Sequence, residues 1–220
     1  MLGSKKEKKD WSMAIYARLK PIDAVRRPMI SYKVNDLRVK QNIQRSVLEF
    51  DVPPDVDPSY IHNYPTGKIP FEFDKVFDQR TAQDEIFDWT TEEKVSDIFD
   101  GINSTIFAYG QTGSGKTYTM FGGETYEDRG LIPRAITTLF QQMKAKKNFS
   151  FTCHMSFLEI YKEVAYDLLD VNKNQKPVEE WSPITILENN DGILLKNLNV
   201  YEVVSEEEAL NLFFLGYSNR

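Results

Sequence analysis

The sequence predicts an α/β fold in which helices flank a central sheet of mostly parallel or mixed strands. Segments with the alternation typical of strands are followed in turn by segments with helical spacing of apolar residues. One glycine-rich segment, GQTGSGKT at residues 110–117, lies between a short apolar segment and a helical one. With 220 residues, 41% of them hydrophobic, the chain is long enough for one globular domain or two small ones.

Composition and charge exclude several classes of protein. No apolar run approaches the roughly 20 residues that a membrane helix needs. The charged start, MLGSKKEKKDW, lacks the apolar core of a secretory signal, and we interpret residues 1–12 as a flexible charged terminus. Cys153 is the single cysteine, which favours a reducing, intracellular setting. The net charge of -6 argues against a general nucleic-acid binder.

Strand and helix signals alternate in the first half of the chain. Residues 13–21, MAIYARLKP, predict a strand that ends at Pro21. Residues 22–70 are the least regular part, and the prolines near their end indicate loops or edge strands. Residues 71–77 predict another strand. Thr81 and Asp84 have the spacing of a capping box, so a helix should follow and end at residues 100–101, Asp-Gly.

The second half begins with residues 103–110, NSTIFAYG, which predict a short buried strand running into the glycine-rich segment. A helix should begin at Lys116, be interrupted by the polar residues 122–130, and resume near residue 133. Residues 149–161 predict a long strand, and residues 189–192 a hairpin turn. Ser205 and Glu208 form a second capping box, and the helix they open should close at Gly216.

The glycine-rich segment matches the pattern G-x-x-x-x-G-K-[ST] at every fixed position. Glycines let successive backbone N–H groups approach phosphate oxygens, and the N-terminus of a following helix favours an anion. Lys116 would supply a cation for the outer phosphates, and Thr117 a hydroxyl for Mg²⁺. The predicted nucleotide-binding residues here are Gly110, Gln111, Thr112, Gly113, Ser114, Gly115, Lys116, Thr117 and Tyr118. The alternatives are an ordinary Gly/Ser turn and a dinucleotide site, but the latter's G-x-G-x-x-G pattern is absent.

A complete nucleotide hydrolase also needs an acidic residue that reaches Mg²⁺ and a group that positions water. Asp167 and Asp170 are the best acidic candidates, but their segment is typical of a strand end that turns into a loop, which favours a structural role. His62 and His154 are widely separated and have no neighbours typical of metal ligands. The chain therefore carries a phosphate-binding loop but no recognisable catalytic residue.

Five blocks of sequence resemble the kinesin motor domain, in the order in which that family has them. They are IFAYGQTGSGKTYTM around the loop, FDKVFD with Gln83 and Phe87 before it, and then RGLIPRA, SFLEIYKEVAYDLLD and ALNLFFLGYSNR. The resemblance covers about residues 13–220 and is closest to the kinesins associated with cilia and flagella. It implies the P-loop NTPase fold, ATP and Mg²⁺ as ligands, microtubules as partner, and a place on the cytoskeleton, in the cytoplasm or in a ciliary or flagellar axoneme.

The resemblance also implies that adenine is held between the end of the first strand, at Arg18 and Pro21, and the ring of Phe87. Lys20 stands where the family has a second arginine, and it keeps the charge but lacks the planar guanidinium. The polar residues 122–128 correspond to a loop beside the nucleotide. The hairpin near Asn190 corresponds to a secondary microtubule contact.

The family's pattern continues beyond the residue at which this chain stops, so we expect residues 13–220 to be the N-terminal part of a motor domain. Strands from the remainder should then lie beside residues 103–110. Each buried backbone group left unpaired there would cost about 1–3 kcal/mol, against a net stability of about 5–15 kcal/mol. We therefore expect residues 1–220 expressed alone to be insoluble or to lack a sharp thermal transition.

Three functions compete at this point. The leading hypothesis is the ATP-binding part of a microtubule-based motor, with the full-length protein a microtubule-stimulated ATPase and this stretch alone inactive. The second is a non-motile structural protein of microtubules or the axoneme that retains the fold. A small-molecule kinase would leave the five ordered blocks unexplained. We expect no nucleic-acid partner and no membrane span, and any dimerisation should involve regions outside this chain, because no sustained heptad run occurs in it.

Overall fold

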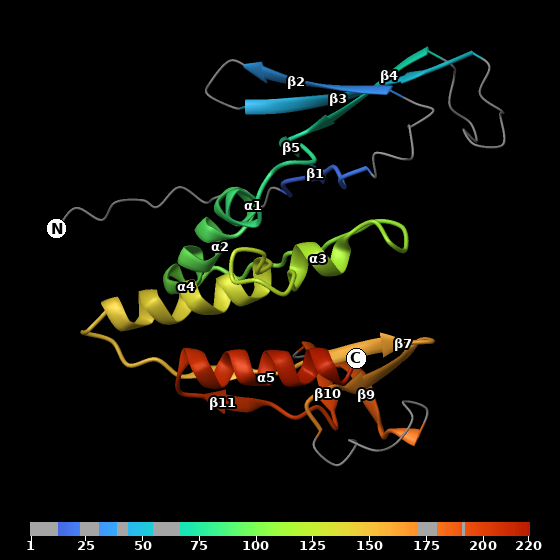
Figure 1. The fold of residues 1–220 in the computed structure, drawn as a ribbon. Coiled ribbons are helices and arrows are strands. Elements are labelled where there is room, and N and C mark those ends of the chain that lie inside the picture. Colours follow the sequence, from blue (N-terminus) through green and yellow to red (C-terminus); the bar gives the residue numbers. More distant parts are fainter. Residues whose placement is uncertain (1–12, 23–30, 39–43, 55–66, 171–179, 191) are drawn as a thin grey trace. The chain divides into compact units, whose positions relative to one another are not determined.

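The computed structural model describes residues 13–22, 31–38, 44–54, 67–170, 180–190 and 192–220. The chain divides into two compact units, unit 1 comprising Met1–Ile86 with Gly110–Gly115, and unit 2 comprising Phe87–Tyr109 with Lys116–Arg220. Helices and strands are both abundant, as Figure 1 shows, which confirms the α/β class. The terminus at residues 1–12, predicted to be flexible, lies outside the described residues.

Unit 1 contains a three-stranded antiparallel sheet of which two strands were not predicted. Its strands are β2 (Ser31–Arg38), β3 (Gln44–Val52) and β4 (Gly67–Phe73), in the order β2-β3-β4. Leu48 is buried and lies opposite Phe71, and Phe50 packs edge-on against the Phe71 ring at a centroid distance of 5.9 Å. Pro70 lies in the edge strand β4, where a missing N–H costs least. The prediction of loops or edge strands applied to the proline-containing residues 51–70, and it is right for β4, which is an edge strand. β2 and most of β3 lie outside that range, in residues for which no strand was predicted.

The strand predicted at residues 13–21 is β1 (Tyr16–Arg18), which is shorter than expected and pairs in parallel with β5 (Lys75–Phe77). The single strand predicted at residues 71–77 is divided between β4 and β5 at Asp74. The Asp74 carboxylate accepts the N–H of Ile15 at 2.7 Å, and the Asp74 N–H donates to the Ile15 carbonyl at 2.9 Å. These two bonds hold the bend against the start of β1.

The predicted helices all form. The first comprises α1 (Gln83–Thr90), α2 (Glu92–Asp97) and a 3₁₀ turn, η2 (Ile98–Asp100); it is followed by α3 (Lys116–Met120), α4 (Leu131–Ala145) and α5 (Glu206–Ser218). The capping box of α5 is confirmed, because the Ser205 hydroxyl accepts the Glu208 N–H at 3.1 Å and the Glu208 carboxylate accepts the Val204 N–H at 2.9 Å. No described helix is long and apolar enough to cross a membrane.

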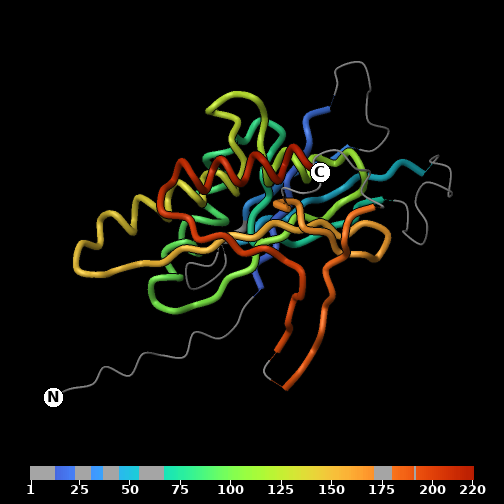
Figure 2. Tube along the Cα trace, turned by 90° about the horizontal axis from the view of Figure 1, so that it is seen from below, coloured from blue at the N-terminus to red at the C-terminus, as the bar shows by residue number. Residues whose placement is uncertain are grey.

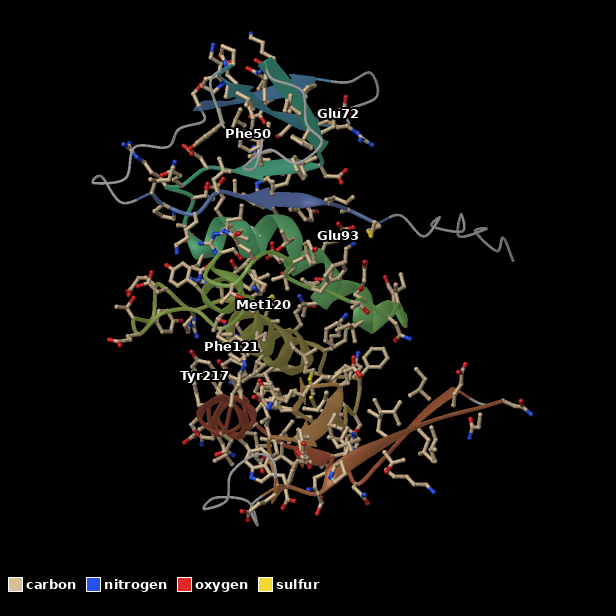
Figure 3. All side chains as sticks on the ribbon, turned by 90° about the vertical axis from the view of Figure 1, so that its right-hand side faces the viewer. Phe50, Glu72, Glu93, Met120, Phe121 and Tyr217 are labelled. Atoms are coloured by element: carbon tan, nitrogen blue, oxygen red, sulfur yellow. The ribbon has the colours of Figure 1, made fainter. Side chains whose placement is uncertain are left out.

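Gly216 lies inside α5 and does not close it, contrary to the prediction. A Cβ on Gly216 would lie 2.2 Å from Cδ1 of Phe157. The Phe157 ring is itself stacked on Phe213 and Phe121, with centroid distances of 6.2 and 6.0 Å. Figure 3 shows Phe121 beside Tyr217, and their ring centroids are 4.7 Å apart. Glycine is therefore required at this position because an aromatic cluster packs directly on the helix backbone.

We expect Gly216→Ala to lower the free energy of unfolding by about 1–3 kcal/mol, the usual cost of overpacking a core. This loss should exceed the gain of up to about 1 kcal/mol that alanine brings to a helix interior. Denaturant unfolding of the full-length protein would measure it, with Asn211→Ala, at an exposed position of the same helix, as the control. An unchanged or raised midpoint for Gly216→Ala would contradict the packing described here.

The described residues of unit 2 form six short strands in two antiparallel sheets. A four-stranded sheet has the order β10-β9-β8-β7 and a two-stranded sheet the order β11-β6. Their bounds are β6 Cys153–Met155, β7 Leu158–Tyr161, β8 Val164–Asp167, β9 Pro183–Asn189, β10 Gly192–Lys196 and β11 Tyr201–Val203. The long strand predicted at residues 149–161 is thus two strands in different sheets. The predicted hairpin is confirmed as β9–β10, which Figure 2 shows extending away from α5.

Residues 103–110, predicted as a buried central strand, have no strand structure. Phe107 is 72% exposed and Tyr109 94% exposed, and no described strand pairs with this segment. An apolar pattern alone does not make a strand, because the backbone N–H and C=O groups need a neighbouring strand to pair with. Among the described strands only β1 and β5 pair in parallel and the other pairs are antiparallel, so the strands are mixed in direction, which is one of the two arrangements expected for the sheet.

Candidate functional site

The glycine-rich loop runs from one unit into the other, since Gly110–Gly115 belongs to unit 1 and α3 begins at Lys116 in unit 2. Within unit 1 the Gln111 carbonyl accepts the Ser114 N–H at 3.1 Å, which closes a four-residue turn. Gly113 is the third residue of this turn and has φ of 79°, a conformation that side chains rarely tolerate. A Cβ at Gly113 would have nothing within 4 Å, so backbone conformation and not crowding requires glycine.

The backbone stays open beyond this turn. Gly115 also has a positive φ, 103°, and open space where a Cβ would lie. The backbone around the two glycines is thus accessible, as it must be if N–H groups are to bind phosphate oxygens. Lys116 and Thr117, the predicted phosphate and Mg²⁺ ligands, are half-buried at the start of α3.

The end of β1 is tied to this loop within unit 1. The Lys20 Nζ donates to the Gly113 carbonyl at 2.8 Å, a contact that the sequence analysis did not predict. The only feature of the sequence that hinted at this contact is that Lys20 stands where the kinesin family has an arginine. Arg18, predicted to contact adenine, donates from Nη1 to Oε1 of Gln83 at 2.8 Å, and Pro21 is exposed.

Phe87, the other residue predicted to contact adenine, lies on α1 and is 6% exposed. The structure thus shows this ring packed in the protein interior. Its stacking on adenine stays a prediction.

Tyr118 contacts the polar segment that separates α3 from α4. Its hydroxyl donates to Oδ1 of Asp128 at 2.9 Å, and the Thr125 hydroxyl donates to Oδ2 of the same carboxylate at 2.8 Å. Hydrogen bonds, from Thr125 first and then Tyr118, hold the pKa of Asp128 below its ordinary value. The Gly123 N–H donates to the Asp128 carbonyl at 2.9 Å. The segment is therefore closed on itself and attached to α3, the helix that begins at Lys116.

We expect the hydrogen bond between Tyr118 on α3 and the Asp128 carboxylate to depend on pH. Because the hydrogen bonds favour the ionised carboxylate, the pKa of Asp128 in the folded protein lies below the value of about 3.9 for an unfolded chain. The stabilisation that the ionised Asp128 carboxylate gives to the folded protein is therefore fully present above its pKa in the unfolded chain. It is lost as the pH falls through the pKa of Asp128 in the folded protein. Tyr118→Phe removes one donor and should raise the pKa of Asp128 toward its ordinary value.

The ¹³C shift of the Asp128 carboxyl, followed by NMR during an acid titration, would measure this change. Tyr126→Phe is the matched control, because it removes a tyrosine hydroxyl from the same segment, and the Tyr126 ring packs against the Arg129 guanidinium, with the Arg129 Cζ 3.6 Å from the ring centroid. Equal pKa values for Asp128 in the parent and in Tyr118→Phe would rule out the Tyr118 contact.

Asp167 has a structural role, as the sequence analysis favoured. It is 1% exposed, and its carboxylate accepts the Leu169 N–H, the Asn199 N–H and the Asn199 Nδ2 group, each at 2.8 Å. Asp170 is half-buried just beyond the end of β8. The bonds of Asp167 join the end of β8 to the segment before β11.

No group of three or more His, Cys, Asp and Glu side chains that could hold a metal ion occurs in the ranges that the structure describes. His154 is exposed on β6, and His62 lies outside the described residues. The binding of Mg²⁺ by Thr117, together with phosphate oxygens, stays a prediction.

A glycine turn of this sequence, followed at once by a helix that begins with lysine and threonine, is typical of P-loop nucleotide-binding proteins. The chain belongs to the kinesin family, because the kinesin motor domain model matches residues 33–220. This membership confirms the predicted P-loop NTPase fold and implies nucleotide binding.

Individual kinesins show the same similarity. The chain is 35% identical to the kinesin-like protein KIF9 of Homo sapiens over 93% of its own length, and 38% identical to the kinesin-like protein KLP1 of Chlamydomonas reinhardtii over 77%. It is 38% identical to the kinesin heavy chain of Syncephalastrum racemosum over 68% of its length. The matched regions make up 24%, 21% and 16% of these relatives, so the chain spans about a quarter or less of their length.

Proposed function

We propose that this chain is the ATP-binding part of a microtubule-based motor, which couples ATP hydrolysis to movement or force on microtubules. The observation that carries the proposal is the intact loop, in which an open glycine turn leads directly into Lys116 and Thr117. Membership of the kinesin family supports both the nucleotide and the microtubule as ligands. We further propose a place on the cytoskeleton, and more narrowly in a ciliary or flagellar axoneme, from the resemblance described above.

MgATP is the proposed ligand. Residues 110–118 would hold its phosphates, with Lys116 balancing the charge of the outer ones. The Thr117 hydroxyl would bind Mg²⁺, which when present stabilises the charge that develops in phosphoryl transfer. Arg18 and Pro21 would contact the adenine, together with Phe87 once its ring becomes accessible.

Phosphate release by the full-length protein, measured with and without polymerised tubulin, tests this proposal. A motor should release phosphate at least about tenfold faster on microtubules, whereas a non-motile structural protein should bind them without stimulation. Lys116→Ala is the control for release by a contaminating ATPase. Co-sedimentation with microtubules at an unstimulated rate of release would favour the structural protein and reject the motor.

A further inference from the structure

We infer that Lys20 is a positioning residue of the phosphate-binding loop. Its ammonium holds the peptide between Gly113 and Ser114 in one orientation and so raises the affinity for the phosphates of the nucleotide. The contact joins residues 93 positions apart in the sequence, with Lys20 Nζ 2.8 Å from the Gly113 carbonyl oxygen. The inference rests on the proposed function of the loop.

The peptide after Gly113 has little intrinsic resistance to rotation. Gly113 has φ of 79° and no Cβ, so this peptide can rotate at little cost. It is held at both ends, because its N–H, that of Ser114, donates to the Gln111 carbonyl while its carbonyl accepts from Lys20. A rotation would break both bonds and would change the direction of the N–H groups that follow in the loop. A charge-assisted hydrogen bond from an ammonium opposes that rotation more strongly than a neutral one would.

Lys20 is presented from a firmly held backbone. On one side the Leu19 N–H donates to the Phe77 carbonyl at 2.9 Å. On the other the Ile22 N–H donates to Oε1 of Gln79 at 3.0 Å, and Nε2 of Gln79 contacts the Tyr32 hydroxyl. The anchor points lie at the end of β5, just beyond it, and on β2, all within unit 1. The ammonium is therefore directed at the loop by the sheet structure of this unit.

The chemistry of the contact defines the variants. Lys20→Met keeps the length and the apolar stem but removes the charge and the donor. Lys20→Arg keeps both, so it should restore the contact. Lys20 is exposed, so its charge at longer range is screened and the effect should come mainly from the hydrogen bond. Lys33→Met is the matched control, because it removes the same charge from an exposed position on β2 in the same unit.

Calorimetric titration of the full-length variants with MgADP, together with KM and kcat for MgATP, tests the inference. Lys20→Met should weaken MgADP binding about tenfold, equivalent to about 1.4 kcal/mol, while Lys20→Arg stays within about threefold of the parent. KM should rise by a similar factor with kcat changed less than about twofold, because the contact orders the loop equally in the ground and transition states. Lys33→Met should bind as the parent does.

Unchanged binding by Lys20→Met would overturn the inference, and so would equal losses in Lys20→Met and Lys20→Arg. A fall in thermal midpoint that accounts for the lost binding would show a merely structural role and would overturn it too. Lys116→Ala separates this inference from the proposed function. If Lys116→Ala binds MgADP as tightly as the parent, the loop is not the nucleotide site; if its binding is weakened while that of Lys20→Met is unchanged, the inference about Lys20 alone fails.

Discussion

Lys116→Ala in the full-length protein is expected to weaken MgATP binding by about 100-fold. Lys116 is the first residue of α3 and follows the glycine turn directly, so its ammonium would meet the charge of the outer phosphates. Hydrogen bonds to charged groups contribute about 1.5–3 kcal/mol each, and about 2.7 kcal/mol corresponds to that loss of affinity. Because half-buried Lys116 is less well hydrated than a surface lysine, its contribution should lie near the upper limit.

Calorimetry with MgATP would measure the loss, and Lys147→Ala, at an exposed lysine just after α4, provides the control. The stability of the variant should change little, since the effect belongs to the bound state. Affinity equal to that of the parent would remove the loop from the nucleotide site and with it the proposed function.

Asp167→Ala is expected to lower the free energy of unfolding by about 3–5 kcal/mol, a large part of the 5–15 kcal/mol typical of a domain. The Asp167 carboxylate is 1% exposed and accepts three hydrogen bonds, two of them from Asn199. Removing it leaves the N–H of buried Leu169 without an acceptor, at a cost of about 1–3 kcal/mol, and the loss of the two hydrogen bonds from Asn199, an exposed residue that water reaches, adds about 1 kcal/mol each. Asp167→Asn should lose less, because its amide oxygen can still accept.

Denaturant unfolding would measure these losses, with Glu188→Ala, at an exposed carboxylate on β9, as the control. Titration with Mg²⁺ at fixed ATP tests the competing role. If Asp167 were the acid that reaches the metal, Asp167→Asn would need far more Mg²⁺ for binding. The structural role requires the Mg²⁺ dependence of the folded variant to match that of the parent.

The features that the sequence predicted correctly depend on neighbours a few residues away. The conformation of the glycine turn is determined by the sequence of the loop itself. The start of α5 is determined by Ser205 and Glu208, and the β9–β10 hairpin by the residues of its turn. In each case the residue that imposes the conformation and the residue that adopts it are close in the chain. Local backbone geometry and hydrogen bonding are therefore sufficient.

Other features were decided by contacts between distant segments. Residues 103–110 have an apolar pattern typical of a strand but no pairing partner among the described strands. The strand that this pattern predicted is therefore absent from the segment. Gly216 was predicted to end a helix, and only the Phe157 ring shows that it is a packing position.

By itself, then, the sequence determined that this protein carries the P-loop motif, because that pattern is encoded in eight consecutive residues. The tertiary structure alone decided that Lys20 contacts that loop and that the Asp167 carboxylate joins β8 to the segment before β11. The reason is that a hydrogen bond across 93 residues, or one across 32, exists only once folding has brought the two groups together.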